Sequence, residues 1–269
     1  MKWLRFLHQG NPVFGIQNGD EVLPTDQSWE GILAGKRDFA RGAALALRDV
    51  QRLLPIPRPA KIIAVGQNYL DHCLEQGKEP PGKPMLFAKL STSAIGPEQS
   101  IIWSRTLTGQ VDFEAELAVV IGKTCRRVQE TEAMDFVLGY TAANDISARD
   151  LQYGDKQFTR GKGLDTFCPL GPVLVEAADI PDPQNLGIRT RLNGSLMQDS
   201  STRQMIFSIP HLIAFSSEAF TLEPGDVLLT GTPHGVGVWR DPPVFLGDGD
   251  MIEVEIEGIG ILRNQCQVE

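Results

Sequence analysis

The feature that most constrains this chain is the stretch from Val111 to Gly122, where acidic and apolar residues alternate before the sequence becomes wholly apolar. A period of two predicts a β-strand, whose successive side chains point to opposite faces. Asp112, Glu114 and Glu116 would then share one face. Crowded carboxylates repel one another and are costly to bury, so they favour a bound cation, and oxygen ligands suit Mg²⁺ before Ca²⁺ or Mn²⁺. A solvated edge strand with an acidic face is the alternative, and the periodicity alone favours neither.

A second apolar stretch, Val137 to Asp145, also predicts a strand, and it ends in an acid. Asp145 can therefore supply a third carboxylate to an ion held by Glu114 and Glu116. Three carboxylates, completed by waters or substrate oxygens, suit six-coordinate Mg²⁺. The alternative is that Asp145 only caps the helix expected directly after it.

His72 and Glu75 lie three residues apart in a short stretch expected to be helical, so their side chains share one helix face. A carboxylate beside an imidazole orients the ring and raises its basicity, as a general base requires. The next residues, 76–84, are polar and rich in Gly and Pro, which is typical of a mobile lid. An ordinary surface His–Glu pair is the alternative.

Four further residues are candidates for contacts with a small anionic substrate. Arg149 and Gln152 are three apart and offer a bidentate fork and an additional donor for a carboxylate. Lys162 lies between two glycines on a segment expected to be flexible, where it can face an oxyanion. Thr232 belongs to a glycine-rich turn, residues 230–237, whose backbone N–H groups can hold a carboxylate; the turn lacks the phosphate-loop pattern. A solvated helix face for Arg149 and Gln152, and an ordinary loop position for Lys162, remain open.

Composition excludes several classes of protein. The chain has 269 residues and a formal net charge of −9, which argues against a nucleic-acid partner or an anionic membrane surface. No apolar run approaches the roughly 20 residues that span a bilayer, and charged residues interrupt the apolar start, so we expect neither a transmembrane helix nor a signal peptide. The four cysteines are widely separated and lack zinc-site spacing, which fits a reduced cytoplasmic location.

The pattern of expected elements indicates a β-rich α+β fold in two parts. Short strands separated by turns occupy residues 1–24, whereas residues 26–54, notably 38–54, carry a helical apolar stripe. Pro55, Pro57 and Pro59 form a stiff connector. We therefore place a boundary near residue 58, between a small N-terminal αβ segment (1–58) and a catalytic domain (59–269). Strands and helices alternate too irregularly after this point for a doubly wound parallel sheet.

Five motifs, taken in order, resemble those of the fumarylacetoacetate hydrolase family, over a match from about Lys61 to the C-terminus. They are GQNY at 66–69 with His72 and Glu75, DFEAELAVVIG at 112–122, NDISARDLQ at 144–152, KGLDTFCPLGP at 162–172 and LTGTPHGVG at 229–237. The DHC run at 71–73 and DPPVFL at 241–246 look most like the branch called fumarylacetoacetate hydrolase domain-containing protein 2 and its bacterial relatives. Gln67 departs from the pattern, because relatives often carry Arg or Leu there.

The resemblance implies the family's mixed β-roll, usually assembled as a homodimer, and it implies roles for the candidate residues. By this resemblance Glu114, Glu116 and Asp145 are Mg²⁺ or Mn²⁺ ligands, His72 and Glu75 are a catalytic pair on the lid, Lys162 is the catalytic lysine, and Arg149, Gln152 and Thr232 contact the substrate.

The family's substrates share a 2-oxo acid or 1,3-dicarbonyl unit, and our leading expectation is C–C hydrolysis of an acylpyruvate-type 2,4-diketo acid. His72 would activate water and Lys162 would support the oxyanion. The alternative uses the same site without attack by water, for keto–enol tautomerisation or decarboxylation of oxaloacetate, or for isomerisation of 2-hydroxyhepta-2,4-diene-1,7-dioate. A catalytically silent metal-binding or assembly protein is a third hypothesis, and the presence of the acids together with His72, Glu75 and Lys162 argues against it.

Overall fold

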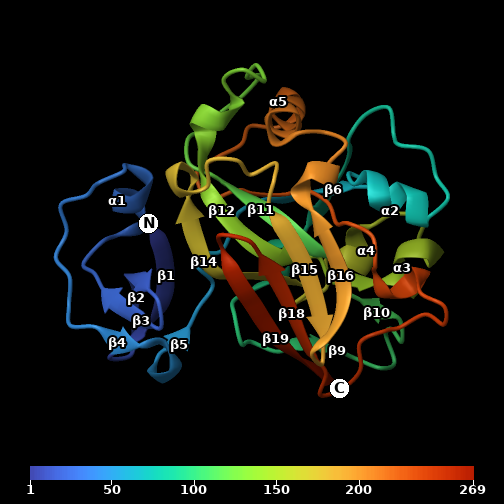
Figure 1. Cartoon of the computed structure of the whole chain (residues 1–269), viewed down its shortest axis with the longest axis horizontal. Coiled ribbons are helices and arrows are strands. Elements are labelled where there is room, and N and C mark those ends of the chain that lie inside the picture. Colours follow the sequence, from blue (N-terminus) through green and yellow to red (C-terminus); the bar gives the residue numbers. More distant parts are fainter.

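The computed structural model describes all 269 residues and is built on two mixed sheets (Figure 1). The larger has twelve strands, in the order β4-β3-β2-β1-β14-β12-β11-β17-β6-β7, with β5 paired to β1 and β8 paired to β14. Its strands are β1 (Lys2–His8), β2 (Asn11–Asn18), β3 (Glu21–Pro24), β4 (Leu45–Ala46), β5 (Gln51–Arg52), β6 (Ile62–Gly66), β7 (Met85–Lys89), β8 (Ala94–Ile95), β11 (Ala115–Ile121), β12 (Val137–Asn144), β14 (Cys168–Glu176) and β17 (Val227–Leu229).

A second sheet of five strands packs against the middle of the first. Its order is β16-β15-β18-β19-β9, with β9 (Ile101–Trp103), β15 (Gly187–Leu192), β16 (Ser195–Ser201), β18 (Met251–Ile256) and β19 (Gly260–Val268). Buried and half-buried residues alternate along β15 and β18, as expected for a sheet with one face on the core. A separate short pair joins β10 (Val111–Asp112) to β13 (Ser147–Ala148).

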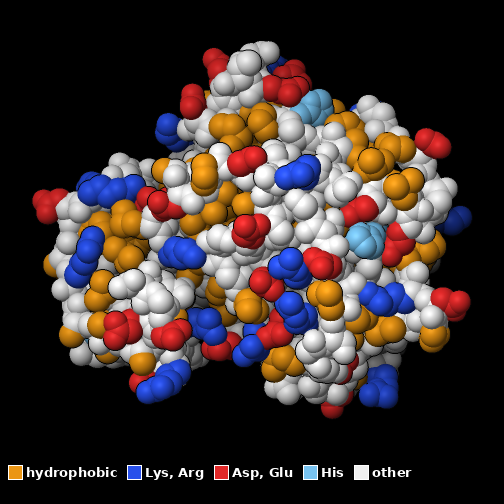
Figure 2. Space-filling model, in the orientation of Figure 1, with side chains coloured by type: hydrophobic (Ala, Val, Ile, Leu, Met, Phe, Trp, Pro, Cys, Tyr) orange, Lys and Arg blue, Asp and Glu red, His pale blue; other side chains and the backbone are white.

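The face of the molecule that carries β15, β16 and β18 bears charges of both signs (Figure 2). Cross-strand ion pairs account for part of this pattern, because Arg189 Nε lies 2.8 Å from Asp199 Oδ1 and Arg191 Nη1 lies 2.6 Å from Glu255 Oε2. Acidic and basic residues therefore neutralise one another along this sheet. The net negative charge of the chain is not concentrated in one block on this face.

Helices are short and lie mostly at the ends of strands. They are α1 (Trp29–Leu33), α2 (Leu70–Glu75), α3 (Arg149–Gly154), α4 (Thr159–Lys162) and α5 (Ile209–Ala219), with 3₁₀ turns η1 (Leu47–Asp49), η2 (Ser91–Ser93), η3 (Ala133–Phe136), η4 (Ala177–Asp179), η5 (Thr202–Gln204) and η6 (Gly237–Trp239). Figure 1 shows α2, α3 and α4 together at one end of the sheets, away from the blue N-terminal strands. No helix combines the length and the apolar character needed to cross a bilayer.

The centre of the large sheet is buried on both faces, which explains the apolar run at the end of the acidic stretch. Every residue of β11 is buried. Leu117 and Val119 belong to the core between the two sheets, whereas Ala118 and Val120 face a second core beneath the N-terminal strands. Glu116 shares the parity of Ala118 and Val120, so it points to the side of the sheet away from the five-stranded sheet.

The acidic stretch is not one strand, contrary to the sequence prediction. The ladder breaks between β10 and β11, at Phe113 and Glu114. Side chains satisfy the two freed backbone N–H groups: Phe113 N donates to Asp112 Oδ1 at 2.8 Å, and Glu114 N donates to Asn144 Oδ1 at 2.9 Å. The stretch therefore belongs to separate strand pairings, β10 with β13, and β11 with β12 and β17.

The helix predicted over residues 38–54 is also wrong. Beyond α1 the only helical turn up to residue 54 is the short 3₁₀ turn η1, and β4 pairs with β3 while β5 pairs with β1. The apolar residues that suggested a helical stripe serve two different cores, because Phe39 packs on Trp3 whereas Leu45, Leu47 and Val50 pack against the core between the sheets. Tertiary packing therefore decides the conformation of this segment.

The β-rich α+β class is confirmed by these sheets and their mixed pairing. The boundary near residue 58 stays a prediction, since β1 pairs with β14 and so extends the large sheet from the N-terminal segment into the rest of the chain. All four cysteines are buried and free.

Candidate active site

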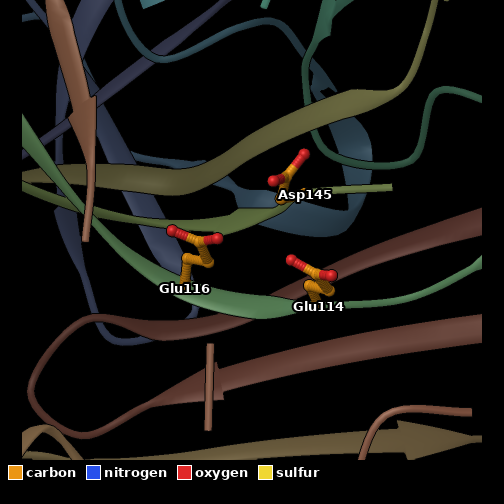
Figure 3. A group of neighbouring side chains, drawn as sticks. All are labelled: Glu114, Glu116 and Asp145. Atoms are coloured by element: carbon orange, nitrogen blue, oxygen red, sulfur yellow. The ribbon is translucent and has the colours of Figure 1, made fainter. Parts of the chain in front are cut away.

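The three carboxylates of Glu114, Glu116 and Asp145 converge on one point, with ligand oxygens within 4.8 Å of one another (Figure 3). The pairing of β11 with β12 causes this. Ala115 lies opposite Asn144 in the register, and Asp145 N donates to Glu114 O at 2.8 Å, so the two strand ends that carry the acids are adjacent. All three side chains are buried, which excludes a solvated acidic edge. Asp145 does not cap α3, because its oxygens accept from lysines.

Two buried lysines neutralise part of this charge. Lys162 Nζ lies 2.7 Å from Glu114 Oε2 and 2.8 Å from Asp145 Oδ2, and the Lys89 ammonium pairs with the other oxygen of Asp145. Burial alone would lower the pKa of Lys162, but Asp145 and Glu114 outweigh it and raise that pKa. Lys162 is therefore held as an ammonium ion.

Lys162 lies at the end of α4, not on a flexible loop as its glycine neighbours had indicated. Gly161 allows this helix to approach α3 closely, because a Cβ atom there would lie 2.7 Å from the backbone nitrogen of Gln152. The glycine thus permits tight packing that carries Lys162 into the buried cluster.

Glu116 differs from the other two acids because it has no ion-pair partner. Its Oε2 accepts one hydrogen bond, from Gly231 N at 2.6 Å. Burial, reinforced by Asp145 and Glu114, raises the pKa of Glu116 well above its usual value. At Glu114 burial also acts upward, but Lys162 and Arg149 outweigh it and lower the pKa to about 2.

The donor set fits a hard divalent cation. With Asp112, the cluster has four carboxylates against three cations, Lys89, Lys162 and Arg149. The carboxylate left unpaired is Glu116, beside the point on which all three acids converge. Positive charge is therefore needed there, and three buried carboxylates without His or Cys suit Mg²⁺ or Mn²⁺.

Arg149 connects two of the acids at the start of α3. Its Nε lies 2.9 Å from Asp112 Oδ2 and its Nη1 lies 2.7 Å from Glu114 Oε1. Nη1 also donates to Gln152 Oε1 at 3.1 Å, so the spacing of three residues does bring these two side chains together. Both residues are buried, which rules out a solvated helix face.

His72 and Glu75 form the expected pair on α2, with Nδ1 of His72 2.8 Å from Glu75 Oε2. His72 is buried, so this is not a surface pair. On the other side of the ring, Nε2 lies 2.7 Å from Nε2 of Gln76, whose Oε1 accepts from Gln67 Nε2 at 3.1 Å. The Glu75 carboxylate accepts from Nδ1–H, so the neutral ring carries its lone pair on Nε2, and the assigned amide of Gln76 directs its NH₂ group at that atom.

The glycine-rich turn does hold carboxylates, but they belong to the protein. Gly231 N donates to Glu116, Gly235 N donates to Glu75 Oε1 at 2.8 Å, and Gly237 N donates to Asp112 Oδ1 at 2.7 Å. The turn thus fixes Glu116 of the acid triad, Glu75, which pairs with His72, and Asp112, which pairs with Arg149. Thr232 is buried and its Oγ1 accepts from Gln198 Nε2 at 2.9 Å.

A cavity of about 320 Å³ opens onto this cluster. Among the predicted site residues, its lining includes His72, Glu114, Arg149, Gln152, Lys162 and Thr232; Glu75, Glu116 and Asp145 lie behind them. Val65, Met85, Phe87 and Phe158 form apolar walls, and Trp239 and Tyr153 contribute at the exposed rim. One space therefore combines His72, one acid of the triad, Glu114, and Lys162.

Sequence reasoning missed three residues at this site. Lys89 could have been recognised from the sequence, because it is a cation in the otherwise apolar run MLFAKL. Gln76 and Lys78 lie in the segment interpreted only as a lid, and both line the cavity. Nothing in the local sequence distinguishes them from other polar lid residues.

Comparison with known proteins agrees with this geometry. The model described as "Fumarylacetoacetate (FAA) hydrolase C-terminal" matches residues 61–267, and one described as "Rv2993c-like, N-terminal" matches residues 1–55. The chain is 50% identical to oxaloacetate tautomerase Fahd2a, mitochondrial, of Rattus norvegicus, over 95% of this chain and 84% of that protein. It is 49% identical to oxaloacetate tautomerase YisK of Bacillus subtilis, over 95% and 86% of the two chains.

A solved structure, the fumarylacetoacetate hydrolase of Exiguobacterium antarcticum, matches with a TM-score of 0.90 and 41% identity, covering all of both chains. The family model alone spans most of the sequence, and the relatives match over nearly its full length. The chain is therefore an enzyme of the fumarylacetoacetate hydrolase family.

Proposed function

We propose that this enzyme catalyses the keto–enol tautomerisation of oxaloacetate with the help of a divalent cation. The observation that carries the proposal is the placement of His72, paired with Glu75 through Nδ1, in a cavity that Glu114 of the acid triad and Lys162 also line. Tautomerisation needs one group that moves a proton between C3 and the C2 oxygen, and an electropositive environment for the enolate. The names of relatives about 50% identical supply the choice of oxaloacetate.

Glu114, Glu116 and Asp145 would hold the cation, and Mg²⁺ is the ion that their hard oxygen ligands favour, with Mn²⁺ next. Members of the family generally bind a divalent metal, which supports this assignment. The bound cation supplies Lewis-acid polarisation of the oxygens of a 2-oxo acid.

His72 is the proton carrier in this proposal. Nε2 takes a proton from C3 of the keto form and delivers it to the C2 oxygen, and the reverse sequence converts enol to keto. Glu75 keeps the Nδ1 proton in place and stabilises the imidazolium that forms, while Gly235 N–H fixes Glu75 in turn. Gln76 contacts Nε2 of His72, so substrate has to displace its amide before the proton moves.

Lys162 and the neighbouring polar groups would bind and orient the substrate. The Lys162 ammonium faces the cavity from the side of Glu114 and Asp145, where it can stabilise negative charge that develops on the enolate oxygen. Arg149, Gln152 and Thr232 line the same wall and offer donors for the C1 carboxylate. Because Arg149 already pairs with two acids, it would orient the substrate more than it would add net positive charge to the cavity.

C–C hydrolysis of an acylpyruvate, which the sequence analysis ranked first, becomes the second candidate. The relatives support tautomerisation, whereas the matching Exiguobacterium structure bears the name of a hydrolase. The two reactions share the metal and the base, and hydrolysis additionally needs a water directed at the distal carbonyl.

A single assay separates the two candidates. Purified protein saturated with Mg²⁺ is mixed with the enol form of oxaloacetate or with acetylpyruvate, and the loss of enol or diketo absorbance is followed while pyruvate and acetate are quantified. We expect rapid loss of oxaloacetate enol absorbance without carbon–carbon cleavage. Stoichiometric release of pyruvate and acetate from acetylpyruvate at a higher kcat/KM would favour hydrolysis instead.

We further propose that the enzyme works as a cytoplasmic homodimer, divided near residue 58 into an N-terminal segment and a catalytic domain. The four free, buried thiols support a reducing compartment, and the homodimer rests on the family resemblance alone. Light scattering of the purified chain tests the assembly, with a mass twice that of the 29.5 kDa chain expected.

A further inference from the structure

The charged groups that line the cavity differ in whether their charge is already compensated. Arg149 pairs with Asp112 and Glu114, and Lys162 pairs with Glu114 and Asp145. His72 pairs with Glu75 through Nδ1 and contacts Gln76 through Nε2. The remaining charged lining residue is Lys78, which forms no ion pair and whose ammonium forms no hydrogen bond.

The backbone of Lys78 is fixed even though its side chain is exposed. α2 ends in a Schellman motif, in which Lys78 N donates to Cys73 O at 2.9 Å and Gly77 N donates to Leu74 O at 3.0 Å. Gly77 adopts the left-handed conformation that this motif requires, with φ +62°. The motif turns the chain back at the end of α2, and Lys78 therefore reaches the cavity that also contains His72 and Gln76.

A substrate with two carboxylates needs an uncompensated cation in addition to the buried groups, as the charge balance of the site shows. A divalent cation added to the four carboxylates and three cations of the cluster leaves one excess positive charge, which the C1 carboxylate of a 2-oxo acid neutralises. A second carboxylate then has no uncompensated partner among the buried groups. The polar lining residues Gln67, Gln76, Gln152, Tyr153 and Trp239 are neutral, so they cannot select for charge.

We propose that Lys78 is a specificity-determining residue that binds the distal carboxylate of dicarboxylic 2-oxo acids. The proposal rests on the proposed function only for the identity of the head group, a 2-oxo acid. Because Lys78 is exposed, its contribution is that of a solvent-screened ion pair, and it falls as ionic strength rises. It acts on substrate binding and so on KM, while the proton transfer at His72 is unaffected.

The test uses a pair of ligands that differ by one charge. 2-Oxoglutarate and 2-oxopentanoate have the same carbon skeleton, with a carboxylate in the first replaced by a methyl group in the second. Their affinities for the full chain in saturating Mg²⁺ are measured by calorimetry at low and high salt for wild type, Lys78→Met and Lys78→Glu. Lys83→Met is the matched control, since Lys83 is an exposed lysine of the same segment that does not line the cavity.

We expect wild type to prefer 2-oxoglutarate, Lys78→Met to reduce this preference by roughly 3- to 10-fold, and Lys78→Glu to reduce it further. Affinity for 2-oxopentanoate should stay within about 2-fold in every variant, and Lys83→Met should match wild type. An unchanged preference in Lys78→Glu, or equal losses for both ligands, would overturn the assignment.

Oxaloacetate kinetics distinguish this proposal from the proposed function. Lys78→Met should raise KM for oxaloacetate by roughly 3- to 10-fold, the factor expected for the ligand preference, with kcat unchanged. If wild type fails to tautomerise oxaloacetate but the binding preference and its loss in Lys78→Glu are observed, the proposed function fails and the assignment of Lys78 stands. If oxaloacetate is turned over normally by Lys78→Glu with unchanged KM, the assignment fails and the proposed function stands.

Discussion

The side-chain amide nitrogen of Gln76 lies 2.7 Å from Nε2 of His72, and its oxygen accepts from Gln67 Nε2 at 3.1 Å on the far side. An NH₂ donor at this position requires an unprotonated Nε2. With Glu75 at Nδ1, the neutral imidazole presents Nε2 as the atom that can accept a proton from a substrate in the cavity.

The chemistry of residue 76 should therefore control His72. Gln76→Glu replaces the donor by a carboxylate, which favours a proton on Nε2 and removes the free base, so we expect kcat for oxaloacetate to fall at least 10-fold at neutral pH. Gln76→Ala removes the donor without adding an acceptor and should change kcat by less than about 5-fold. Steady-state kinetics at saturating Mg²⁺ measure both. Equal effects of the two substitutions would contradict the assigned tautomer.

Glu116→Gln should affect the melting temperature differently in metal-free protein and in protein with Mg²⁺. In metal-free protein the substitution removes a buried carboxylate that has no cation partner, so Tm should equal or exceed that of wild type. With Mg²⁺ the wild-type Tm should rise by mass action, by the equivalent of about 2.7 kcal/mol at 100 times Kd, whereas the variant should show little rise.

Glu114→Gln is the control for this prediction, because Glu114 is paired with Lys162 and Arg149 and its loss should lower Tm even without metal. Thermal unfolding over a Mg²⁺ titration gives the Tm of wild type and of both variants with and without metal. If Mg²⁺ raised the Tm of Glu116→Gln as much as it raises that of wild type, Glu116 would not belong to the proposed ligand set.

Asp112 is expected to act through Arg149. Both of its oxygens accept N–H donors, Oδ1 from Phe113 and Gly237 and Oδ2 from Arg149 and Val238. Asp112→Asn puts an NH₂ group against donors in either orientation and should cost roughly 1–3 kcal/mol of unfolding free energy. Its effect on Mg²⁺ affinity should be smaller than that of Glu114→Gln.

Chemical denaturation and Mg²⁺ calorimetry check this expectation. Asp155→Asn provides the comparison, since Asp155 pairs with Arg160 at an exposed site and its loss should leave the denaturation midpoint near wild type. If Asp112→Asn is as stable as Asp155→Asn, the buried network around Arg149 does not have the energetic importance assigned to it.

The segment 76–84 should gain order when ligand binds. α2 itself is anchored, because Asp71 Oδ2 accepts from Ser200 Oγ at 2.5 Å and lies 3.0 Å from His234 Nδ1, while Glu75 accepts from Gly235 N. The following residues are mostly exposed and offer little core contact. Hydrogen exchange with saturating Mg²⁺ should show higher protection of 76–84 after oxalate is added, with α2 changed less. Unchanged exchange in 76–84 would contradict a lid.

Much of the site could be predicted from sequence because its chemistry is local to strand and helix ends. The acids at 114, 116 and 145 lie at the adjacent ends of two paired strands, and the spacing of three residues brings together His72 with Glu75 and Arg149 with Gln152. The β-rich fold followed from the same periodicities.

What could not be predicted depends on long-range packing. Period-two alternation did not reveal the break at Phe113 and Glu114, because Asn144, thirty residues away, satisfies one of the freed N–H groups. The helix predicted over residues 38–54 does not form, because the apolar residues that suggested it pack into two different cores. The partners of the glycine-rich turn could not be predicted either, since its N–H groups bind acids from two distant segments, α2 and the acidic stretch.

The central claim is that His72 moves the proton while the acid triad independently holds the metal. The most direct measurement is the rate of enol loss from oxaloacetate by wild type and His72→Ala in saturating Mg²⁺, with Mg²⁺ and oxalate affinities measured on the same samples. We predict that His72→Ala loses roughly 10²–10⁴-fold in kcat, the usual contribution of a general base, while both affinities stay within about 3-fold of wild type. Wild-type turnover by His72→Ala, with Mg²⁺ and oxalate still bound, would contradict the account.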